Sequence, residues 1–279
     1  MKKRIAFEGV LGAYSDLACR AARPDYEPLP CETAAEAVDA VHEGRAELAL
    51  IPVENTVAGR VLAVHYLLPK SGLYIVGEHY QPVEHHLLAL PGANLVDIRK
   101  AYSHVHALPQ CNYWLKRHNI EPVVRPDTAG SAKEVAELGD MSIAAVASKL
   151  AGELYGLKSL AADIADVPGN TTRCLILSPV QHRPNASDGP CITTLIYRIR
   201  NIPAALYKTL GGFATCGVNI TRLESYLVDG GFRVAQFWVD VEGHPDEKPL
   251  KLALEELAFF TEELEILGVY PASAVRSAN

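Results

Sequence analysis

Short apolar segments alternate with helical segments from Ile5 to Leu177, and this alternation restricts the possible folds most. Runs such as Ile5–Phe7, Leu48–Ile51 and Ser142–Val146 are predicted strands, and a segment of helical character follows each of them. Leu48–Ile51 is apolar at every position, which is typical of a strand buried on both faces. The alternation therefore predicts an α/β fold built on a largely parallel sheet with helices on both faces.

A change of composition divides the chain in two. The segment from Ser178 to Pro190 is rich in Pro, Asn, Ser and Asp, so it is a predicted linker. Beyond it the patterns follow the order βαββαβ, with a hairpin turn signal at Asp229-Gly230-Gly231. The predicted strands cover 192–199, 217–228, 232–241 and 264–270, and the predicted helices cover 204–214 and 249–263. This order is typical of a ferredoxin-like domain, and the predicted domain boundaries are 1–180 and 190–279.

Charge and composition exclude several classes of protein. The chain has 279 residues, 49% of them hydrophobic, and a formal net charge of −7. Nucleic acids and anionic membranes are bound by basic surfaces, so both are disfavoured as partners. No apolar run approaches the ~18 residues of a membrane span, and the basic N-terminus leads into a strand rather than a signal peptide. The six cysteines lack any Cys-x-x-Cys pair, which indicates free thiols in a reducing cytosol, so a cytoplasmic protein is expected.

Polar residues gather at four places where a predicted strand meets a loop or helix. These clusters are Glu54-Asn55-Thr56, Ser103-His104 with Gln110, Asp127-Thr128, and Asn170-Thr171-Thr172-Arg173. A two-glycine loop that ends at Tyr14 and Ser15 follows the first strand in the same way. Because ligands of open α/β sheets bind at the carboxyl ends of strands, the clusters predict a cleft between two lobes of the first domain.

The Asn170–Arg173 cluster suits a small anionic, hydroxylated ligand. Arg173 can bind a carboxylate through two parallel hydrogen bonds, and Asn170 and Thr172 can donate to hydroxyl groups. The alternative is a polar turn whose side chains cap their own backbone. In the same way Glu54-Asn55-Thr56 can instead cap a helix over 61–68, and His104 can simply pack.

Metal binding is not predicted. His104-x-His106 has no acidic or thiolate partner at a recognisable spacing. The neighbouring pair His85-His86 is interpreted as part of a strand with one ring buried and one exposed.

Several motifs in a fixed order carry a resemblance to a known family. They are Gly9–Ser15, Pro52-Val53-Glu54-Asn55-Thr56, Tyr102-Ser103-His104 with Gln110-Cys111, Asp127-Thr128-Ala129, Ala151-x-Glu153-Leu154-Tyr155-Gly156 and Asn170-x-Thr172-Arg173. From about residue 4 to residue 271 the chain resembles prephenate dehydratase. The resemblance implies a two-lobed catalytic domain like a type II periplasmic binding protein, followed by a C-terminal ACT regulatory domain.

The resemblance also implies a reaction and a set of roles. Prephenate loses water and carbon dioxide to give phenylpyruvate in L-phenylalanine biosynthesis, and aromatisation drives the step without a cofactor or metal. Thr172 is implied as the proton donor or stabiliser of the leaving hydroxide, and Arg173 as the carboxylate ligand. Further catalytic residues are implied at Glu54, Asn55, Ser103 and Gln110, and further substrate-binding residues at Asn170, Thr56, Tyr14, His104 and Thr128.

The chain departs from the family in three places. Cys174 stands where Phe is usual after Thr-Arg. The usual Gly-Ala-Leu of the ACT domain is Ala204-Ala205-Leu206, and its Glu-Ser-Arg-Pro is Glu224-Ser225-Tyr226-Leu227. Those two segments and Asn219 are the expected allosteric site, with phenylalanine as the expected effector and tyrosine as the open alternative.

Partners and rival functions follow from the same resemblance. ACT domains usually pair edge to edge, so a homodimer or homotetramer is expected. One rival is an arogenate dehydratase, which acts on the amino analogue of prephenate. The other is a non-catalytic amino-acid sensor on the same scaffold.

Overall fold

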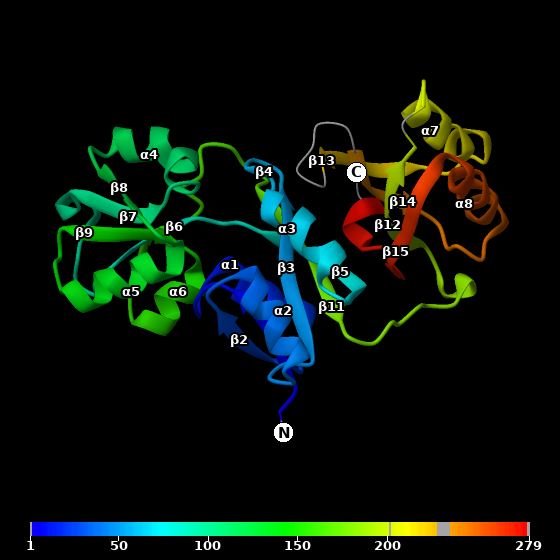
Figure 1. Ribbon diagram of the computed structural model, residues 1–279. Helices are drawn as coiled ribbons and strands as arrows, with labels where there is room; N and C mark the ends of the chain where they lie inside the picture. The colour runs from blue at the N-terminus through cyan, green and yellow to red at the C-terminus, as the bar shows by residue number, and fades with distance from the viewer. Residues whose placement is uncertain (1, 201, 228–234, 278–279) are drawn as a thin grey trace. The chain divides into compact units, whose positions relative to one another are not determined.

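The computed structural model describes residues 2–200, 202–227 and 235–277 (Figure 1). The chain divides into two compact units, Met1–Val64 with His79–Cys174 and His65–Glu78 with Leu175–Asn279. The domain boundaries at 180 and 190 stay a prediction. No sequence pattern indicated that residues 65–78 belong with the C-terminal unit.

The first lobe of the first unit is built on a sheet with the order β2-β1-β3-β11. Its elements are β1 (Arg4–Glu8), α1 (Tyr14–Ala22), β2 (Glu27–Cys31), α2 (Ala34–His42), β3 (Leu48–Asn55), β4 (Gly59–Arg60) and β11 (Thr171–Ser178). β1 pairs in parallel with both β2 and β3. Phe7, Leu50 and Ile51 are fully buried, which confirms that Leu48–Ile51 is a core strand.

Side-chain hydrogen bonds cap the start of α2. The Thr33 hydroxyl accepts a hydrogen bond from the Glu36 N–H at 3.1 Å. The Glu36 carboxylate reaches back one residue further than a capping box requires, and accepts from the Glu32 N–H at 2.7 Å.

The second lobe of the first unit has a five-stranded sheet with the order β10-β6-β9-β7-β8. Its strands are β6 (His86–Ala89), β7 (Lys100–His104), β8 (Glu121–Arg125), β9 (Ile143–Ala147) and β10 (Lys158–Ala161), and its helices are η2 (Leu95–Asp97), η3 (Leu108–Cys111), α4 (Asn112–Arg117), α5 (Thr128–Leu138) and α6 (Lys149–Tyr155). β7 runs parallel to β8 and β9, but β6 runs antiparallel to β9 and β10. The prediction of a largely parallel sheet was therefore wrong here, because β6 enters the lobe from the opposite direction.

Helices cover both faces of this sheet, as predicted. Leu87 packs in a cluster with Cys111 and Leu115, while its neighbour Leu88 packs with Ala132 of α5. Because successive strand residues point to opposite faces, these two clusters are the two sides of the sheet.

The second unit contains the predicted βαββαβ order. Its elements are β12 (Cys191–Ile199), α7 (Ala205–Thr215), β13 (Ile220–Leu227), β14 (Ala235–Glu242), α8 (Lys248–Phe260) and β15 (Thr261–Pro271), with short helices η4 (Ala186–Asp188) and η5 (Ala274–Ser277). The strands pair antiparallel in the order β13-β14-β12-β15, and α7 and α8 pack on one face, where Tyr197, Phe213 and Leu257 are buried. The hairpin turn predicted at 229–231 lies outside the described residues.

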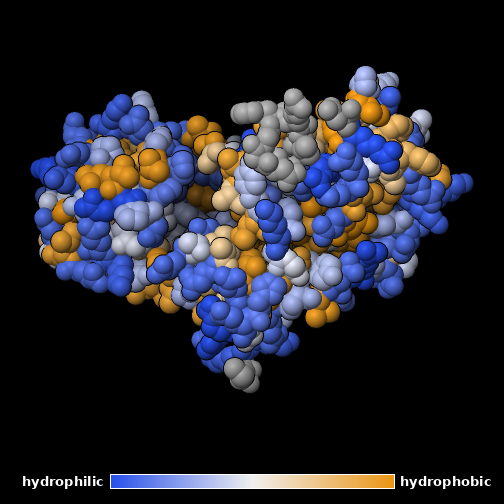
Figure 2. All heavy atoms as spheres, viewed as in Figure 1, coloured by the Kyte–Doolittle hydropathy of each residue, from blue (hydrophilic) through white to orange (hydrophobic). Residues whose placement is uncertain are grey.

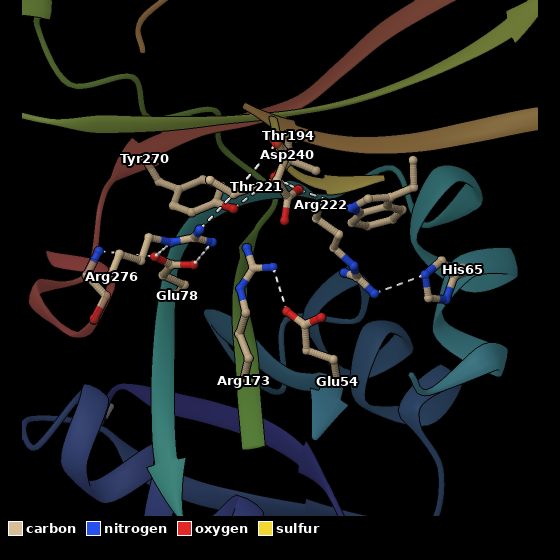
Figure 3. A network of polar contacts seen from close by, with 12 residues as sticks. Glu54, His65, Glu78, Arg173, Thr194, Thr221, Arg222, Asp240, Tyr270 and Arg276 are labelled. Atoms are coloured by element: carbon tan, nitrogen blue, oxygen red, sulfur yellow. Dashed lines mark hydrogen bonds and ion pairs between the residues drawn. The ribbon is translucent and has the colours of Figure 1, made fainter. Parts of the chain in front are cut away.

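Three elements have residues in both units: α3 (Leu62–Leu67), β5 (Tyr74–Pro82) and β11. The short helix η1 (Leu68–Lys70) lies between the first two. Within the second unit, Glu78 of β5 accepts two hydrogen bonds from Arg276, at 2.7 and 2.9 Å (Figure 3). Ile75 pairs with Gly268 of β15, where a Cβ would lie only 2.2 Å from the Ile75 carbonyl oxygen. These contacts hold β5 against β15. Within the described residues, no helix is long and apolar enough to cross a membrane.

Ala204 occupies a backbone conformation that favours glycine. It precedes α7 with φ 58° and ψ 25°, in the left-handed region. This is the position where the family resemblance implies Gly, so the substitution noted in the sequence carries backbone strain. We expect Ala204→Gly to raise the free energy of unfolding by about 1 kcal/mol, measured by urea denaturation.

Ala214 is the matched control in the same helix. It is exposed in the last turns of α7, so Ala214→Gly should lower the free energy of unfolding by roughly 0.5–1 kcal/mol. Equal and negative effects at both positions would contradict the assignment of strain to Ala204.

Tyr226 is a second residue that departs from the family pattern. Its side chain is buried, and its ring packs edge-on against Tyr66 with centroids 5.5 Å apart. Burial and the neighbouring Tyr66 raise the pKa of Tyr226 to about 12, and its hydroxyl has no hydrogen-bond partner among the described residues. Tyr226→Phe should therefore raise the free energy of unfolding by about 1 kcal/mol, because it removes an unsatisfied buried hydroxyl. A lower melting temperature would show that the hydroxyl is bonded.

Candidate active site

A cavity of about 370 Å³ lies within the first unit. Its lining comes from the Gly9–Ser15 loop, the β3–β4 hairpin, the end of β5, η3, the start of α5 and β11. Figure 2 shows the surface hollowed where the lobe of β6–β9 meets the lobe of β1–β3. Strand ends of both lobes contribute, which is the position that the polar clusters predicted.

Seven of the predicted site residues line this cavity. They are Tyr14, Asn55, His104, Gln110, Thr128, Asn170 and Thr172. Residues separated by more than a hundred positions in the chain are thus brought to one place.

Arg173 is not among the residues that line the cavity, and its role as a carboxylate ligand stays a prediction. β11 begins at Thr171 rather than after Arg173, so the motif lies inside a strand. Successive side chains of a strand point to opposite faces, and Thr172 and Cys174 face the cavity while Arg173 does not. Arg173 is only 3% exposed, and its guanidinium donates to Glu54 Oε1 at 2.9 Å (Figure 3).

Glu54 is likewise placed outside the cavity lining, because it precedes Asn55 in β3 and points to the other face. One of its contacts is the ion pair with Arg173. This pair holds the Arg173 guanidinium in place, and the catalytic role of Glu54 stays a prediction.

Ser103 and Thr56 also have structural contacts in place of cavity contacts. Ser103 is fully buried, and its hydroxyl donates to the Val146 carbonyl at 2.5 Å, which ties β7 to β9. The Thr56 hydroxyl accepts from the Thr171 N–H at 2.9 Å, and its own N–H donates to the Thr171 carbonyl at 3.0 Å. Thr56 thus fixes β11 beside the β3–β4 hairpin.

Asn55 caps a turn and also binds Thr172. Its Oδ1 accepts from the N–H groups of Val57 at 2.9 Å and Ala58 at 2.7 Å. Its Nδ2 donates to Asn170 Oδ1 at 2.6 Å and to Thr172 Oγ1 at 2.9 Å. Since Thr172 accepts in this bond, its own hydrogen remains to be donated elsewhere.

The hydrogen bonds between side-chain amides continue from Asn170 to Gln110. Asn170 is 5% exposed, and its Nδ2 donates to Gln110 Oε1 at 2.6 Å. Gln110 Nε2 donates to the His106 carbonyl at 2.7 Å. Hydrogen bonds through Asn170 and Gln110 therefore fix the orientation of Asn55, which donates to the Thr172 hydroxyl.

His85 is the main site residue that the sequence did not reveal. Its Nε2 lies 3.3 Å from Gln110 Oε1, and its Nδ1 lies 2.9 Å from the Tyr14 hydroxyl. The Tyr14 hydroxyl is also 2.8 Å from the Glu84 carbonyl. Both His85 and His86 are buried, so the prediction of one exposed ring was wrong.

The cavity has few charged groups. Among the described residues that line it there is no Lys or Arg, and the basic side chains are His85, His104 and His106. Burial lowers the pKa of His104, and so does His106. Glu8 is an acidic lining residue that the sequence did not point to, and burial raises the pKa of its carboxyl group.

Two helices begin at the cavity wall. The start of α1 contributes Ala13, Tyr14 and Ser15, and the start of α5 contributes Asp127 and Thr128. Asp127 Oδ1 accepts from the Gly130 N–H at 2.6 Å and so caps the start of α5. Ala13, at the N-cap of α1, has no side chain that can cap, so the first N–H groups of α1 remain suited to an anion.

Cys174 is a small, unreactive part of the wall. It is 1% exposed, and burial raises the pKa of its thiol to about 12. The thiol therefore stays protonated at neutral pH. All six cysteines are free, and no group of three or more metal-ligating side chains occurs in the described ranges.

The predicted allosteric residues all lie in the second unit. Ala204, Ala205 and Leu206 form the start of α7, and Ala205 is buried while Leu206 is exposed. Asn219 precedes β13 and donates to Glu242 Oε2 at 3.1 Å. Glu224 and Ser225 lie in β13, which is the edge strand of its sheet.

A family model described as prephenate dehydratase matches residues 5–182 of the chain. A protein from Komagataeibacter europaeus, named as a bifunctional N-acyl-homoserine lactone acylase/prephenate dehydratase, is 53% identical over 98% of this chain and 97% of its own length. An Arabidopsis thaliana protein, named arogenate dehydratase/prephenate dehydratase 1, is 35% identical over 99% of this chain and 74% of its own.

Solved structures share the fold. A structure described as GqqA, a quorum-quenching acylase, has a TM-score of 0.92 and 53% identity, covering 98% of this chain and 100% of that one. A prephenate dehydratase from Arthrobacter aurescens, solved in complex with L-Phe, has a TM-score of 0.87 and 31% identity, covering 96% and 90%.

Proposed function

The chain belongs to the prephenate dehydratase family, an enzyme family of hydro-lyases, and we propose that it converts prephenate to phenylpyruvate in L-phenylalanine biosynthesis. The observation that carries this proposal is the position of Thr172. Its hydroxyl lines a cavity, accepts from Asn55 at 2.9 Å, and retains its hydrogen for a ligand.

The reaction needs a donor for the leaving hydroxide. As carbon dioxide departs, the electron pair of the breaking C–C bond enters the ring, and the ring C–OH bond breaks. A hydrogen bond from Thr172 to the departing oxygen stabilises the developing charge, and a proton must follow for water to leave. A fixed donor is effective because it needs little reorganisation during the step, and the Asn55–Asn170–Gln110 chain supplies that rigidity.

To bind prephenate, the cavity must compensate the negative charges of its two carboxylates with positive or hydrogen-bond-donating groups. No guanidinium or ammonium group lines the cavity within the described residues. The start of α1 offers backbone N–H groups and the positive end of a helix dipole. The polar side chains of Tyr14, His104 and Thr128 line the same space.

Arogenate is the alternative substrate. Relatives from Arabidopsis thaliana and Petunia hybrida are named arogenate dehydratases, at 34–36% identity. Arogenate differs from prephenate by an ammonium group in place of a keto group, and the net charge of the ligand is lower. The charge balance of the cavity does not distinguish them, so both substrates belong in the test.

Regulation by phenylalanine is the second part of the proposal. Two observations support it: the C-terminal unit has the βαββαβ order expected of an ACT domain, and the Arthrobacter aurescens relative was solved in complex with L-Phe. The effector site is proposed at the start of α7 and along β13, with tyrosine as the alternative ligand. β13 is a sheet edge with Leu223 and Leu227 exposed, which supports pairing with a second copy in a homodimer or homotetramer.

The test supplies prephenate and arogenate separately to the purified protein and identifies the products. Phenylpyruvate from prephenate, with a higher kcat/KM than phenylalanine formation from arogenate, is the expected result. Binding without turnover of either compound would favour the sensor. Because the 53% identical relative is named as bifunctional, release of fatty acid from an N-acyl-homoserine lactone is measured in parallel.

A further inference from the structure

The hydrogen-bond directions around His85 are fixed by its surroundings. The backbone N–H groups of Val57 and Ala58 donate to Asn55 Oδ1, so the other end of this amide is its NH₂ group. That NH₂ group donates to Asn170 Oδ1, which in turn makes Asn170 the donor to Gln110 Oε1. Gln110 therefore presents an acceptor to His85, and His85 Nε2 carries a hydrogen.

The other side of the ring meets a hydroxyl with a single hydrogen and two close acceptors. The Tyr14 oxygen lies 2.9 Å from His85 Nδ1 and 2.8 Å from the Glu84 carbonyl oxygen. With a neutral ring, Tyr14 can donate to only one of them. With a protonated ring, Nδ1–H donates to Tyr14, and Tyr14 donates to Glu84, so all three contacts are satisfied. The geometry therefore fits the imidazolium form of His85.

Burial opposes that form when the cavity holds no ligand. It lowers the pKa of His85 more than the hydrogen bond to Gln110 raises it, and of the nearby charged groups His86 lowers this pKa while Asp163 raises it. Tyr14 and Cys111 have pKa values raised by burial and are neutral at pH 7, and the cavity lining also holds the titratable groups Glu8, His104, His106 and Asp127. An unoccupied cavity thus favours neutral His85 although the hydrogen bonds suit its cation.

A dianionic ligand in the cavity would favour the protonated form of His85 over the neutral form. It brings two negative charges beside a buried imidazole in a site whose described lining has no Lys or Arg. We propose that His85 takes up a proton when the substrate binds. The imidazolium that forms supplies a positive charge that compensates the substrate carboxylates. This inference rests on the proposed function, because it requires an anionic ligand in this cavity.

Isothermal titration of prephenate into the Thr172→Ala variant tests the proposal, since binding is then observed without turnover. In buffers of different ionisation enthalpy at pH 7.5, the slope of observed enthalpy should show uptake of about one proton per site. The affinity should fall by up to about tenfold per pH unit above the pKa of unliganded His85, because the protonated form binds better. Adding His85→Gln, which preserves a donor to Gln110, should abolish the uptake.

His118→Gln is the matched control. His118 stacks on Trp114, does not line the cavity, and should leave the uptake unchanged. ¹⁵N NMR of the histidine rings in Thr172→Ala gives a readout that does not depend on how His85→Gln folds. Prephenate should shift both His85 nitrogens to imidazolium values.

Binding without proton uptake, or uptake that persists in His85→Gln, would overturn the inference and leave the proposed function standing. An NMR signal of neutral His85 in the complex would also overturn it. Failure of prephenate to bind at all would contradict the proposed function and this inference together.

Discussion

Thr172→Ala should reduce kcat for phenylpyruvate formation by about 10²–10⁴-fold, the range of a lost proton donor at the reacting bond. The cause is chemical, because Ala keeps the strand conformation of β11 and the cavity while it removes the hydroxyl that Asn55 orients at 2.9 Å. KM should change little. Initial rates over a range of prephenate concentrations separate the two parameters.

Thr172→Ser is the control for this prediction. It retains the hydroxyl and the bond from Asn55, so most of the activity should remain. If Thr172→Ala kept turnover near that of the unaltered enzyme, the assignment of Thr172 as donor would be abandoned. Equal losses in Ala and Ser variants would indicate that the methyl group matters instead of the hydroxyl.

Arg173→Met should destabilise the protein instead of weakening substrate binding. Arg173 is 3% exposed and paired with Glu54 at 2.9 Å, and its side chain lies outside the cavity lining. Removing one member of a fully buried ion pair costs roughly 3–5 kcal/mol of folding free energy, and the loss here should be smaller because the Glu54 side chain is 36% exposed and can be solvated. We therefore expect a clear fall in the urea midpoint, while the folded variant keeps its KM for prephenate.

Arg45→Met provides the comparison at the surface. Arg45 pairs with Glu43 at 2.6 Å, but both side chains are largely exposed, so its loss should not change the urea midpoint measurably. A raised KM for Arg173→Met with normal stability would restore Arg173 as a substrate ligand, as the motif alone suggested.

The sequence predicted the elements and the place of the site well. Hydrophobic patterns located the core strands of both lobes and the βαββαβ order, because burial on one or both faces leaves a direct trace in the sequence. Strand-end clusters located the cavity because parallel strands bring their carboxyl ends to one edge.

The direction of individual side chains could not be predicted in the same way. Whether Arg173 or Thr172 faces the cavity depends on the pairing register of β11, because a shift of the register by one residue exchanges the two faces. β11 includes Thr171, Thr172 and Arg173 of the polar motif, and Asn170 directly precedes it.

His85 was missed because its role depends on contacts distant in sequence. Its partners Tyr14 and Gln110 are 71 and 25 positions away, and an apolar strand follows it directly. A histidine at the start of a strand carries no local signal of a hydrogen-bond chain. The directions of these hydrogen bonds are set by the backbone N–H groups of Val57 and Ala58, which donate to Asn55 Oδ1. Such backbone contacts leave no pattern in the sequence.

The most direct measurement is the formation of phenylpyruvate from prephenate by the purified chain, followed by absorbance at neutral pH beside its Thr172→Ala variant. The account predicts rapid accumulation of phenylpyruvate with the unaltered protein and a rate at least about a hundredfold lower with the variant. Absence of phenylpyruvate, or equal rates from the two proteins, would contradict a prephenate dehydratase that acts through Thr172.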